Sequence, residues 1–422
     1  MDNELINNDI ERKEAKFKWA VLVSSALMLL CLTMGLTSWS VAVGELSEHL
    51  GMTSTQVMLG GSLFVLGFIC ASGIYGRIIE VIGFKKAGLM GLCVSVIAQF
   101  LIPASSSITF ILILRFFMGF GMITPPIYYV AGIWFPPKQR GFAIGLLGAM
   151  FFFGMSLGGI LSGALIPVVG WRATFYIIAG ATLVGAIQWA IICRRPLSYE
   201  EEQAAEVEAA TLDDKAKKDN VFKHSMIWLL ALLYFCDFFI VYAMENVTAV
   251  FLDDSAYDVR SIGTLVFAVS LLGVAAAPFG GLITDFFVNK SSRQPHSMRA
   301  ICLLVGGFAM SGLGIFLIPI IGMKGFALCA ICMLIIGWGD GFMDSTATVV
   351  GIDAMGPEKG DKAVGYMIFL GGIGGVISPI FINWIGGSVG WTVAWVVLGI
   401  AAIIGIIDCL VISRKHVEHD KM

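Results

Sequence analysis

The feature that most constrains this chain is a series of long apolar stretches that recurs from one end to the other. Of its 422 residues, 58% are hydrophobic and only 14% are charged, and a water-soluble domain cannot hide that much apolar surface. A membrane-spanning helix needs about 20 mostly apolar residues, and lipid offers the backbone no hydrogen-bond partners. The pattern therefore predicts an all-α polytopic membrane protein. Twelve such stretches begin near Trp19, Val57, Ala87, Thr109, Phe142, Arg172, Met226, Ile262, Arg299, Gly325, Val364 and Trp391.

The chain ends and the basic residues predict the orientation of the helices. The first 17 residues are polar and charged, and the apolar stretch that follows is long enough to span, so we expect a retained helix and no cleaved signal. With a cytoplasmic N-terminus, the opposite side receives only three of the 27 basic residues, Arg172, Arg260 and Lys324. The positive-inside rule then places both termini in the cytoplasm. We expect a multi-pass protein of the plasma (inner) membrane.

A charged linker and an internal repeat divide the chain into two halves. Residues 194–224 are too polar to pack a core, which predicts a linker between six helices and six more. GFGMITPP from Gly119 and GWRATF from Gly170 have counterparts 220 positions later, in GDGFMDST from Gly339 and GWTVAW from Gly390. Repeats of this kind build transporters with a binding site between the halves. The expected units are a tail (1–18), a bundle (19–193), the linker (194–224), a second bundle (225–412) and a second tail (413–422).

Short motifs beside the second and eighth stretches are similar to those of a known family. GRIIEVIGFKK, with Gly76, Glu80 and Gly83, resembles the loop motif of the major facilitator superfamily, and GLITDFFVNK, with Asp285, resembles its counterpart in the second half. Arg115 stands in a stretch that resembles the helix 4 motif of the same superfamily. The resemblance implies two six-helix bundles around a cavity that opens alternately to either side. It also implies that Gly76, Glu80, Gly83 and Asp285 serve cytoplasmic gating.

Two longer segments carry a finer resemblance. Residues 35–57 and 121–146 resemble the corresponding segments of oxalate:formate antiporters and monocarboxylate transporters. Those families carry charged residues in helix 8, and the oxalate exchangers carry a Lys in helix 11, whereas the matching stretches here have no charge. The resemblance therefore implies a small organic acid anion, such as a monocarboxylate, and not a dicarboxylate held between two cations.

Charged residues inside the apolar stretches indicate where the function resides. A charge at mid-membrane costs about 2.5 to 3.5 kcal/mol even on lenient insertion scales, so such residues usually face the bundle interior or a water-filled cavity. The resemblance assigns the first, fourth, seventh and tenth helices to that cavity. All five deeply placed charges belong to the fourth, seventh and tenth stretches: Arg115, Asp237, Glu245, Asp340 and Asp344.

Arg115 has three possible roles. Its guanidinium stays charged and offers a planar fork that suits a carboxylate. That carboxylate belongs either to a substrate or to the protein, and the Arg either couples transport to an ion or pairs with a buried acid to hold helices together. We predict Arg115 as a substrate-binding residue, with Glu245 as the first acid to test as its partner.

The acids predict proton coupling. Asp340 and Asp344 are one helical turn apart, so both project from one face, and two close carboxylates in a poorly solvated site resist ionising together. Asp237 lies near the middle of its stretch, and Glu245 lies nearer the outer end. We predict that Asp237, Asp340, Asp344 and Glu245 form the proton-coupling set, and the alternative is that they are neutral acids hydrogen-bonded in a packed interior.

Three aromatic residues complete the predicted substrate site. Tyr129 follows Arg115 by 14 residues and shares its face if the helix stays regular, although Pro125 and Pro126 kink a helix and free its carbonyls. Trp39 and Tyr234 are further candidates, and the alternative for both is ordinary packing or interface anchoring.

The remaining motifs bear on the class of protein. The chain has no phosphate-binding loop of the G-x-x-x-x-G-K-[ST] type, no metal-ligand cluster and no nucleophile motif. We therefore expect neither an enzyme nor an ATP-driven pump, with no cofactor, no metal and no nucleic-acid partner. The expected partners are the lipid bilayer, a small-molecule solute and a proton or counter-anion, and we expect a monomer.

Three functions fit these observations. The first is a secondary active transporter that moves a small organic acid anion by alternating access, coupled to protons or by exchange. The second keeps this machinery but carries a neutral or cationic solute such as a drug, because four cavity acids stand against one Arg. The third is a membrane sensor that binds a solute without moving it.

Overall fold

The computed structural model describes residues 2–135, 137–196, 225–355 and 360–415, and within these ranges the chain is helical with no strand. The predicted all-α membrane fold is confirmed. Most of the predicted linker, residue 136, residues 356–359 and the last seven residues lie outside the described residues.

The first half consists of helices connected by short turns. Thr53 caps one of them, since its side chain accepts a hydrogen bond from the Gln56 N–H while the Gln56 side chain accepts one from the Thr53 N–H. The helices are α1 (Asp2–Val41), α2 (Val43–Leu50), α3 (Ser54–Ile82), α4 (Phe84–Ala104), α5 (Ile108–Phe120), α6 (Thr124–Trp134) and α7 (Pro137–Ile192).

The second half follows the same plan and contains one π-helical turn. Its elements are α9 (Ser225–Asp254), α10 (Val259–Lys290), α11 (Pro295–Leu303), the π-helix η2 (Leu304–Ala309), α12 (Met310–Ile320), the 3-10 helix η3 (Gly322–Lys324), α13 (Phe326–Met355), α14 (Gly360–Ser388) and α15 (Trp391–Arg414).

The internal repeat is visible in the backbone at its two Gly-Trp pairs. Gly170 interrupts α7 with a φ of 79°, and Gly390, 220 positions later, precedes α15 with a φ of 114°. Positive φ is readily adopted by glycine and strained for other residues, so both pairs need glycine where the chain turns back into the bundle. Matching sequence here corresponds to matching backbone.

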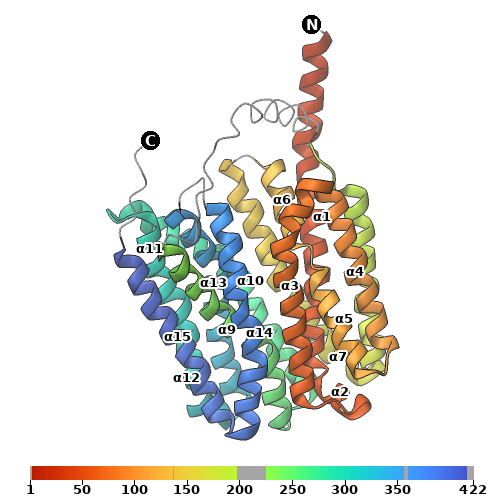
Figure 1. Cartoon of the computed structure of the whole chain (residues 1–422), viewed down its shortest axis with the longest axis vertical. Helices are drawn as coiled ribbons and strands as arrows, with labels where there is room; N and C mark the ends of the chain where they lie inside the picture. Colours follow the sequence, from red (N-terminus) through yellow and green to blue (C-terminus); the bar gives the residue numbers. More distant parts are fainter. Residues whose placement is uncertain (1, 136, 197–224, 356–359, 416–422) are drawn as a thin grey trace.

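Ten helices in the described residues are long and apolar enough to cross a membrane. One of them, Gly145–Ile192, is 48 residues long and includes the turn at Gly170, while Ile108–Phe120 is shorter than a full span. The count of twelve and the cytoplasmic position of the termini stay predictions. We therefore call the end of the molecule where α1 begins and α15 ends the terminal face, and the opposite end the far face (Figure 1).

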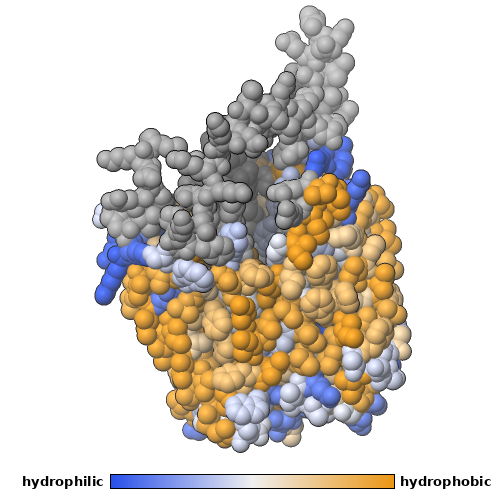
Figure 2. Space-filling model, viewed as in Figure 1, coloured by the Kyte–Doolittle hydropathy of each residue, from blue (hydrophilic) through white to orange (hydrophobic). Residues whose placement is uncertain are grey.

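The two halves stand side by side (Figure 1). Helices α1 to α7 form one group and α9 to α15 the other, and the visible surface between the two faces is a belt of hydrophobic residues with hydrophilic ones beyond it (Figure 2). Large apolar side chains such as Ile97, Val184 and Trp384 are exposed. A surface of this kind suits contact with acyl chains.

Small residues bring the halves together at the far face. A Cβ at Gly163 of α7 would lie 3.0 Å from the Gly263 Cα of α10, and a Cβ at Gly263 would lie 2.6 Å from the Gly159 carbonyl oxygen. The Ser156 hydroxyl donates to the Phe267 carbonyl across the same junction. Because glycine has no side chain, the backbones of α7 and α10 approach each other closely at this junction.

Candidate functional site

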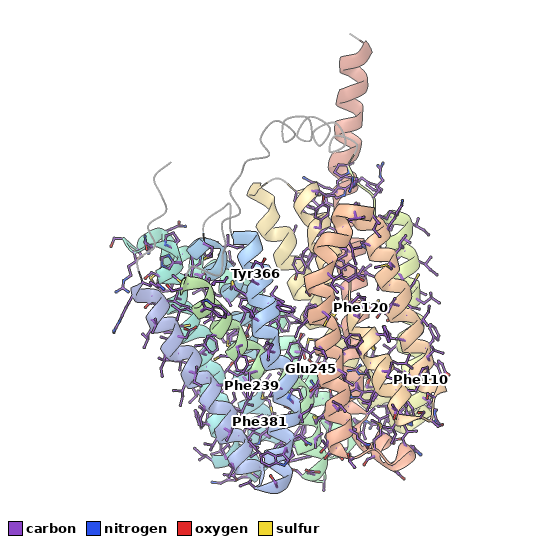
Figure 3. The ribbon with its side chains drawn as sticks, viewed as in Figure 1. Phe110, Phe120, Phe239, Glu245, Tyr366 and Phe381 are labelled. Atoms are coloured by element: carbon purple, nitrogen blue, oxygen red, sulfur yellow. The ribbon has the colours of Figure 1, made fainter. Side chains whose placement is uncertain are left out.

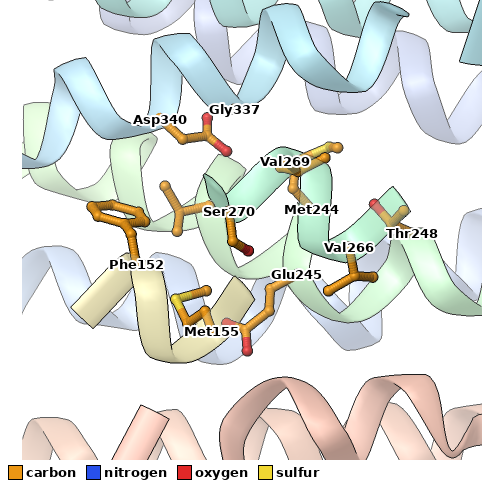
Figure 4. A pocket seen from close by; sticks show the side chains of 11 residues that line it. Phe152, Met155, Met244, Glu245, Thr248, Val266, Val269, Ser270, Gly337 and Asp340 are labelled. Atoms are coloured by element: carbon orange, nitrogen blue, oxygen red, sulfur yellow. The ribbon is translucent and has the colours of Figure 1, made fainter. Parts of the chain in front are cut away.

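A small cavity lies between the halves near the middle of the molecule (Figure 4). Its volume is about 40 Å³. The first half contributes Phe152 and Met155 from α7, and the second half contributes the rest, including two acids, Glu245 of α9 and Asp340 of α13. The site is mainly apolar, with a few polar groups, as is usual for small-molecule sites.

Glu245 is buried at the junction between the halves (Figure 3). Neither of its carboxylate oxygens has a hydrogen-bond partner among the described residues. Arg115 is near enough for the two charges to interact, although the predicted direct ion pair is not formed in this arrangement. An ionised carboxylate left in this state is costly, and a proton or an approaching cation removes the cost.

Arg115 is buried inside the first half, with 1% of its surface exposed. Its Nε donates to the Gly60 carbonyl at 3.2 Å and its Nη1 to the Gly35 carbonyl at 3.5 Å. The guanidinium also lies against two aromatic rings, those of Trp39 and Phe64. Nη2 is buried and has no hydrogen-bond partner among the described residues, so one donor of the guanidinium is left unsatisfied.

The residue after Glu245 links this Arg to the second half. Asn246 packs against Gly61 of α3, next to the carbonyl of Gly60 that holds Arg115. The Asn246 Oδ1 has no hydrogen-bond partner among the described residues. Unsatisfied polar groups from both halves therefore gather around one contact between α3 and α9.

Asp340 is the better satisfied of the two cavity acids. Its Oδ1 accepts a hydrogen bond of 3.0 Å from Ser311 of α12. Gly339 makes room for this contact, because a Cβ there would collide with the Ser311 side chain. Asp237 of α9 is also buried, with Oδ1 lacking a partner among the described residues, and it lies within electrostatic range of Asp340 and Asp344.

Asp344 differs from the other acids in being exposed. It stands 11 residues before Met355, about 16 Å from that end of α13 at 1.5 Å per residue. Its charge acts on Tyr128 of the first half and on Tyr234 of the second. The Tyr234 hydroxyl is hydrogen-bonded to that of Thr348. An exposed acid at this depth, close to tyrosines from both halves, faces the space between them.

A break in the fourth stretch separates Arg115 from Tyr128 and Tyr129. Helix α5 ends at Phe120 and α6 begins at Thr124, so the helix is not regular between Arg115 and Tyr129. The Tyr129 ring lies 5.9 Å from that of Phe84, within the first half. The charge of Asp344 acts on the neighbouring Tyr128.

Trp39 is fully buried inside the first half. Its Nε1 donates to the Val57 carbonyl at 2.9 Å, and its ring packs on Gly60. It borders a smaller cavity of about 20 Å³ that also includes Arg115 and Gln99. Trp39 therefore supports Arg115 from behind and does not line the central cavity.

The predicted gating residues lie at the terminal face. Gly76 and Glu80 lie in the last two turns of α3, and Gly83 joins α3 to α4 with a φ of 81°. Asp285 pairs with Arg299 at 2.7 Å, and Arg299 also bonds Asp353 at 2.7 Å. This bridge ties α10, α11 and α13 together within the second half.

The described residues contain no group of three or more His, Cys, Asp or Glu side chains that could hold a metal ion. The two cavity acids belong to different helices and approach an apolar space. The arrangement suits reversible binding of a solute and protons.

Comparison with known proteins identifies the family. The sequence model of the Major Facilitator Superfamily matches residues 24–378, with a further match over 298–421. The chain belongs to the Major Facilitator Superfamily. The predicted superfamily is confirmed.

Among individual relatives of this superfamily member, the ascochitine biosynthesis cluster MFS transporter of Didymella fabae is 27% identical over 71% of this chain and 64% of its own. This chain therefore spans slightly less than two thirds of that relative. The hexuronate transporter of Bacillus subtilis (strain 168) is 22% identical over 82% of each chain. The solved structure of a bacterial homolog to human lysosomal transporter Spinster, inward-facing and unoccupied, has a TM-score of 0.71 at 16% identity, covering 94% of this chain and 97% of that one. It shows the same fold.

Three residues at the site were not among those predicted. Tyr128 stands beside a predicted residue, and the charge of Asp344 acts on it. Ser311 and Phe152 are uncharged residues in apolar stretches, and no sequence signal separates them from ordinary packing residues. The sequence offered one indication of a close contact here: a glycine, Gly339, stands directly before Asp340 in the repeated segment.

Proposed function

We propose that this protein is a secondary active transporter of a small organic acid anion, coupled to protons. The observation that carries the proposal is the cavity between the halves, where Glu245 and Asp340 share one apolar space. A transporter of this superfamily has its binding site between its two repeats. The hexuronate transporter among its relatives is named for an organic acid anion, which supports the same class of substrate.

Protons allow an acidic cavity to accept an anion. Ionised, Glu245 and Asp340 repel a substrate carboxylate, and once protonated they become hydrogen-bond donors to it. Arg115 does not line this cavity but lies within electrostatic range of Glu245, and its positive charge then favours the anion. In this mechanism the substrate enters with protons, and Asp237 and Asp344 pass protons between the cavity and water.

Alternating access follows from the way the halves meet. Close contacts at the far face, between α7 and α10, seal one side of the cavity, while Asp344 is exposed on the terminal side. This arrangement corresponds to a state that is open toward the terminal face. Rocking the halves about the central cavity would separate the far-face glycines and close the other side.

Uptake into proteoliposomes tests the substrate and the coupling. Labelled glucuronate, lactate, formate and oxalate would each be offered with and without an inward proton gradient. We expect accumulation of at least one acid that rises with the gradient and collapses on adding a protonophore. Uptake that is insensitive to the gradient but requires an internal acid would replace proton coupling by exchange, and no transport of any acid would refute the proposal.

A second substrate class is a neutral or cationic solute, including a drug. The acidic residues of the central cavity favour it, because ionised Glu245 and Asp340 attract a cation directly. A cationic dye that leaves loaded vesicles in exchange for protons would support this alternative, and tight binding without any movement would support a sensor.

We also propose that the protein acts as a monomer in the plasma membrane, with both termini in the cytoplasm and the domain limits stated above. Membrane fractionation tests the location, and light scattering in detergent tests the monomer. Alkaline phosphatase fused after Arg414 should be inactive, while green fluorescent protein fused there should fluoresce. The reverse result would overturn the orientation.

A further inference from the structure

Ser311 bonds Asp340 but is not among the residues that line the central cavity. It is fully buried in the first turn of α12, directly after the π-helix η2. Its hydroxyl is 3.0 Å from the Asp340 Oδ1 and 3.4 Å from the Ile336 carbonyl oxygen. A serine has one hydroxyl hydrogen, so it can donate fully to only one of these two acceptors at a time.

The backbone holds this serine in place. A Cβ at Gly339 would collide with the Ser311 side chain and would lie 2.8 Å from the Gly307 carbonyl oxygen, so α13 is pressed against η2 and the start of α12. π-helical turns are rare and often accompany functional sites. Here η2 ends at Ala309, two residues before Ser311, which bonds Asp340.

The charged groups around Asp340 are acids. Among the described residues, Glu245 shares its cavity, Asp237 lies within electrostatic range on α9, and Asp344 follows one turn later on α13. From α12 it meets only the neutral hydroxyl of Ser311, and Ser270 of α10 lines the same cavity. Ser311 is thus the group in contact with Asp340 that stabilises its ionised form.

Building on the proton coupling proposed above, we propose that Ser311 is a positioning residue that reverses its hydrogen bond when Asp340 gains or loses a proton. With Asp340 ionised, the Ser311 hydroxyl donates to Oδ1. When Asp340 takes a proton from water in the cavity, its new O–H donates to the Ser311 oxygen, and the Ser311 hydroxyl turns to the Ile336 carbonyl. Both states leave the buried pair satisfied, so proton binding carries no penalty of an orphaned group.

The test replaces the hydroxyl and follows the proton. Ser311→Ala removes it, Ser311→Thr restores it, and Ser378→Ala is a matched control, since Ser378 is equally buried and its hydroxyl has no partner among the described residues. The carboxylic acid C=O band of Asp340, identified by its loss in Asp340→Asn, is titrated by infrared difference spectroscopy in purified protein. This readout does not depend on transport.

We expect Ser311→Ala to move the midpoint of this band upward by about one pH unit and to change its frequency, because a hydrogen bond to the ionised form is lost. Ser311→Thr and Ser378→Ala should match the parent protein. The pH at half-maximal uptake should move in the same direction. If Ser311→Ala does not fold, a Ser311→Thr titration with an altered midpoint or band would still overturn the proposal, whereas an unaltered one supports it.

An unchanged midpoint and frequency in folded Ser311→Ala would overturn the inference. Failure of the proposed function gives a different pattern, in which the band responds to Ser311→Ala while uptake ignores pH. In that case the hydrogen-bond reversal stands and proton coupling does not.

Discussion

The guanidinium carbon of Arg115 lies 4.7 Å from the centroid of the Trp39 ring. Phe64 provides a second ring at 4.9 Å, and two backbone carbonyls accept hydrogen bonds from the same side chain. Aromatic faces and carbonyl dipoles stabilise a desolvated cation without neutralising it. Arg115 therefore keeps its full charge inside the first half, within electrostatic range of Glu245 in the second.

This relationship predicts coupling between Arg115 and Glu245. Arg115→Gln or Glu245→Gln alone leaves one buried charge without its opposite, so each should lower thermal stability and reduce uptake at least tenfold. The loss of stability in the double variant should be smaller than the sum of the two single losses, by about 0.5 to 3 kcal/mol. Thermal unfolding in detergent measures all four proteins.

Arg172→Gln serves as the control for this cycle, because Arg172 is exposed at the far face, where it stacks on Trp171 and hydrogen-bonds Ser105 and Ser106. Strict additivity of the Arg115 and Glu245 losses would show that the two charges do not interact across the halves.

Exposure predicts which acid meets water in this state. In a background without reactive cysteines, Asp344→Cys should react quickly with a membrane-impermeant maleimide applied from the terminal side. Asp340→Cys should react at least ten times more slowly, since Asp340 is buried. Equal rates, measured by gel shift, would contradict the arrangement of the two carboxylates described above.

The far-face glycines predict a second effect. Gly163→Val places a side chain against the α10 backbone, and overpacking of this kind costs about 1 to 3 kcal/mol. We expect α7 and α10 to stay apart at the far face. Maleimide should then reach cysteines placed there, and the apparent affinity for substrate should change.

Gly180→Val is the control, because a Cβ at Gly180 meets nothing within 4 Å. If both variants resemble the parent in labelling and in transport, the contact between α7 and α10 does not seal the far face.

The bridge of Arg299 predicts unequal effects of its two acids. Asp285 is 58% exposed and Asp353 23% exposed, and an exposed ion pair contributes only about 0 to 1 kcal/mol. Asp353→Asn should therefore lower the unfolding temperature more than Asp285→Asn, and salt should weaken the Asp285 contribution more. A larger loss from Asp285→Asn would instead point to the gating role that its motif implies.

Some relationships followed from the sequence because they depend on local properties. Each apolar stretch is long enough to be recognised by itself, and the expense of placing Arg115 or Asp237 in lipid indicated that these residues lie inside the bundle, as the structure shows. The repeat was equally legible, because a turn with positive φ needs glycine at both Gly170 and Gly390.

The sequence by itself thus determined the membrane bundle, its repeated halves and the residues that must avoid lipid, since length, hydropathy and charge act residue by residue. Only the tertiary structure decided that Glu245 and Asp340 share one cavity, that the charge of Asp344 acts on Tyr128, and that Ser311 bonds Asp340. Those relationships depend on the helix break at residues 121–123, on the π-turn before α12 and on glycine contacts between distant segments. These features set the rotation and the spacing of the helices, and no local sequence pattern encodes either.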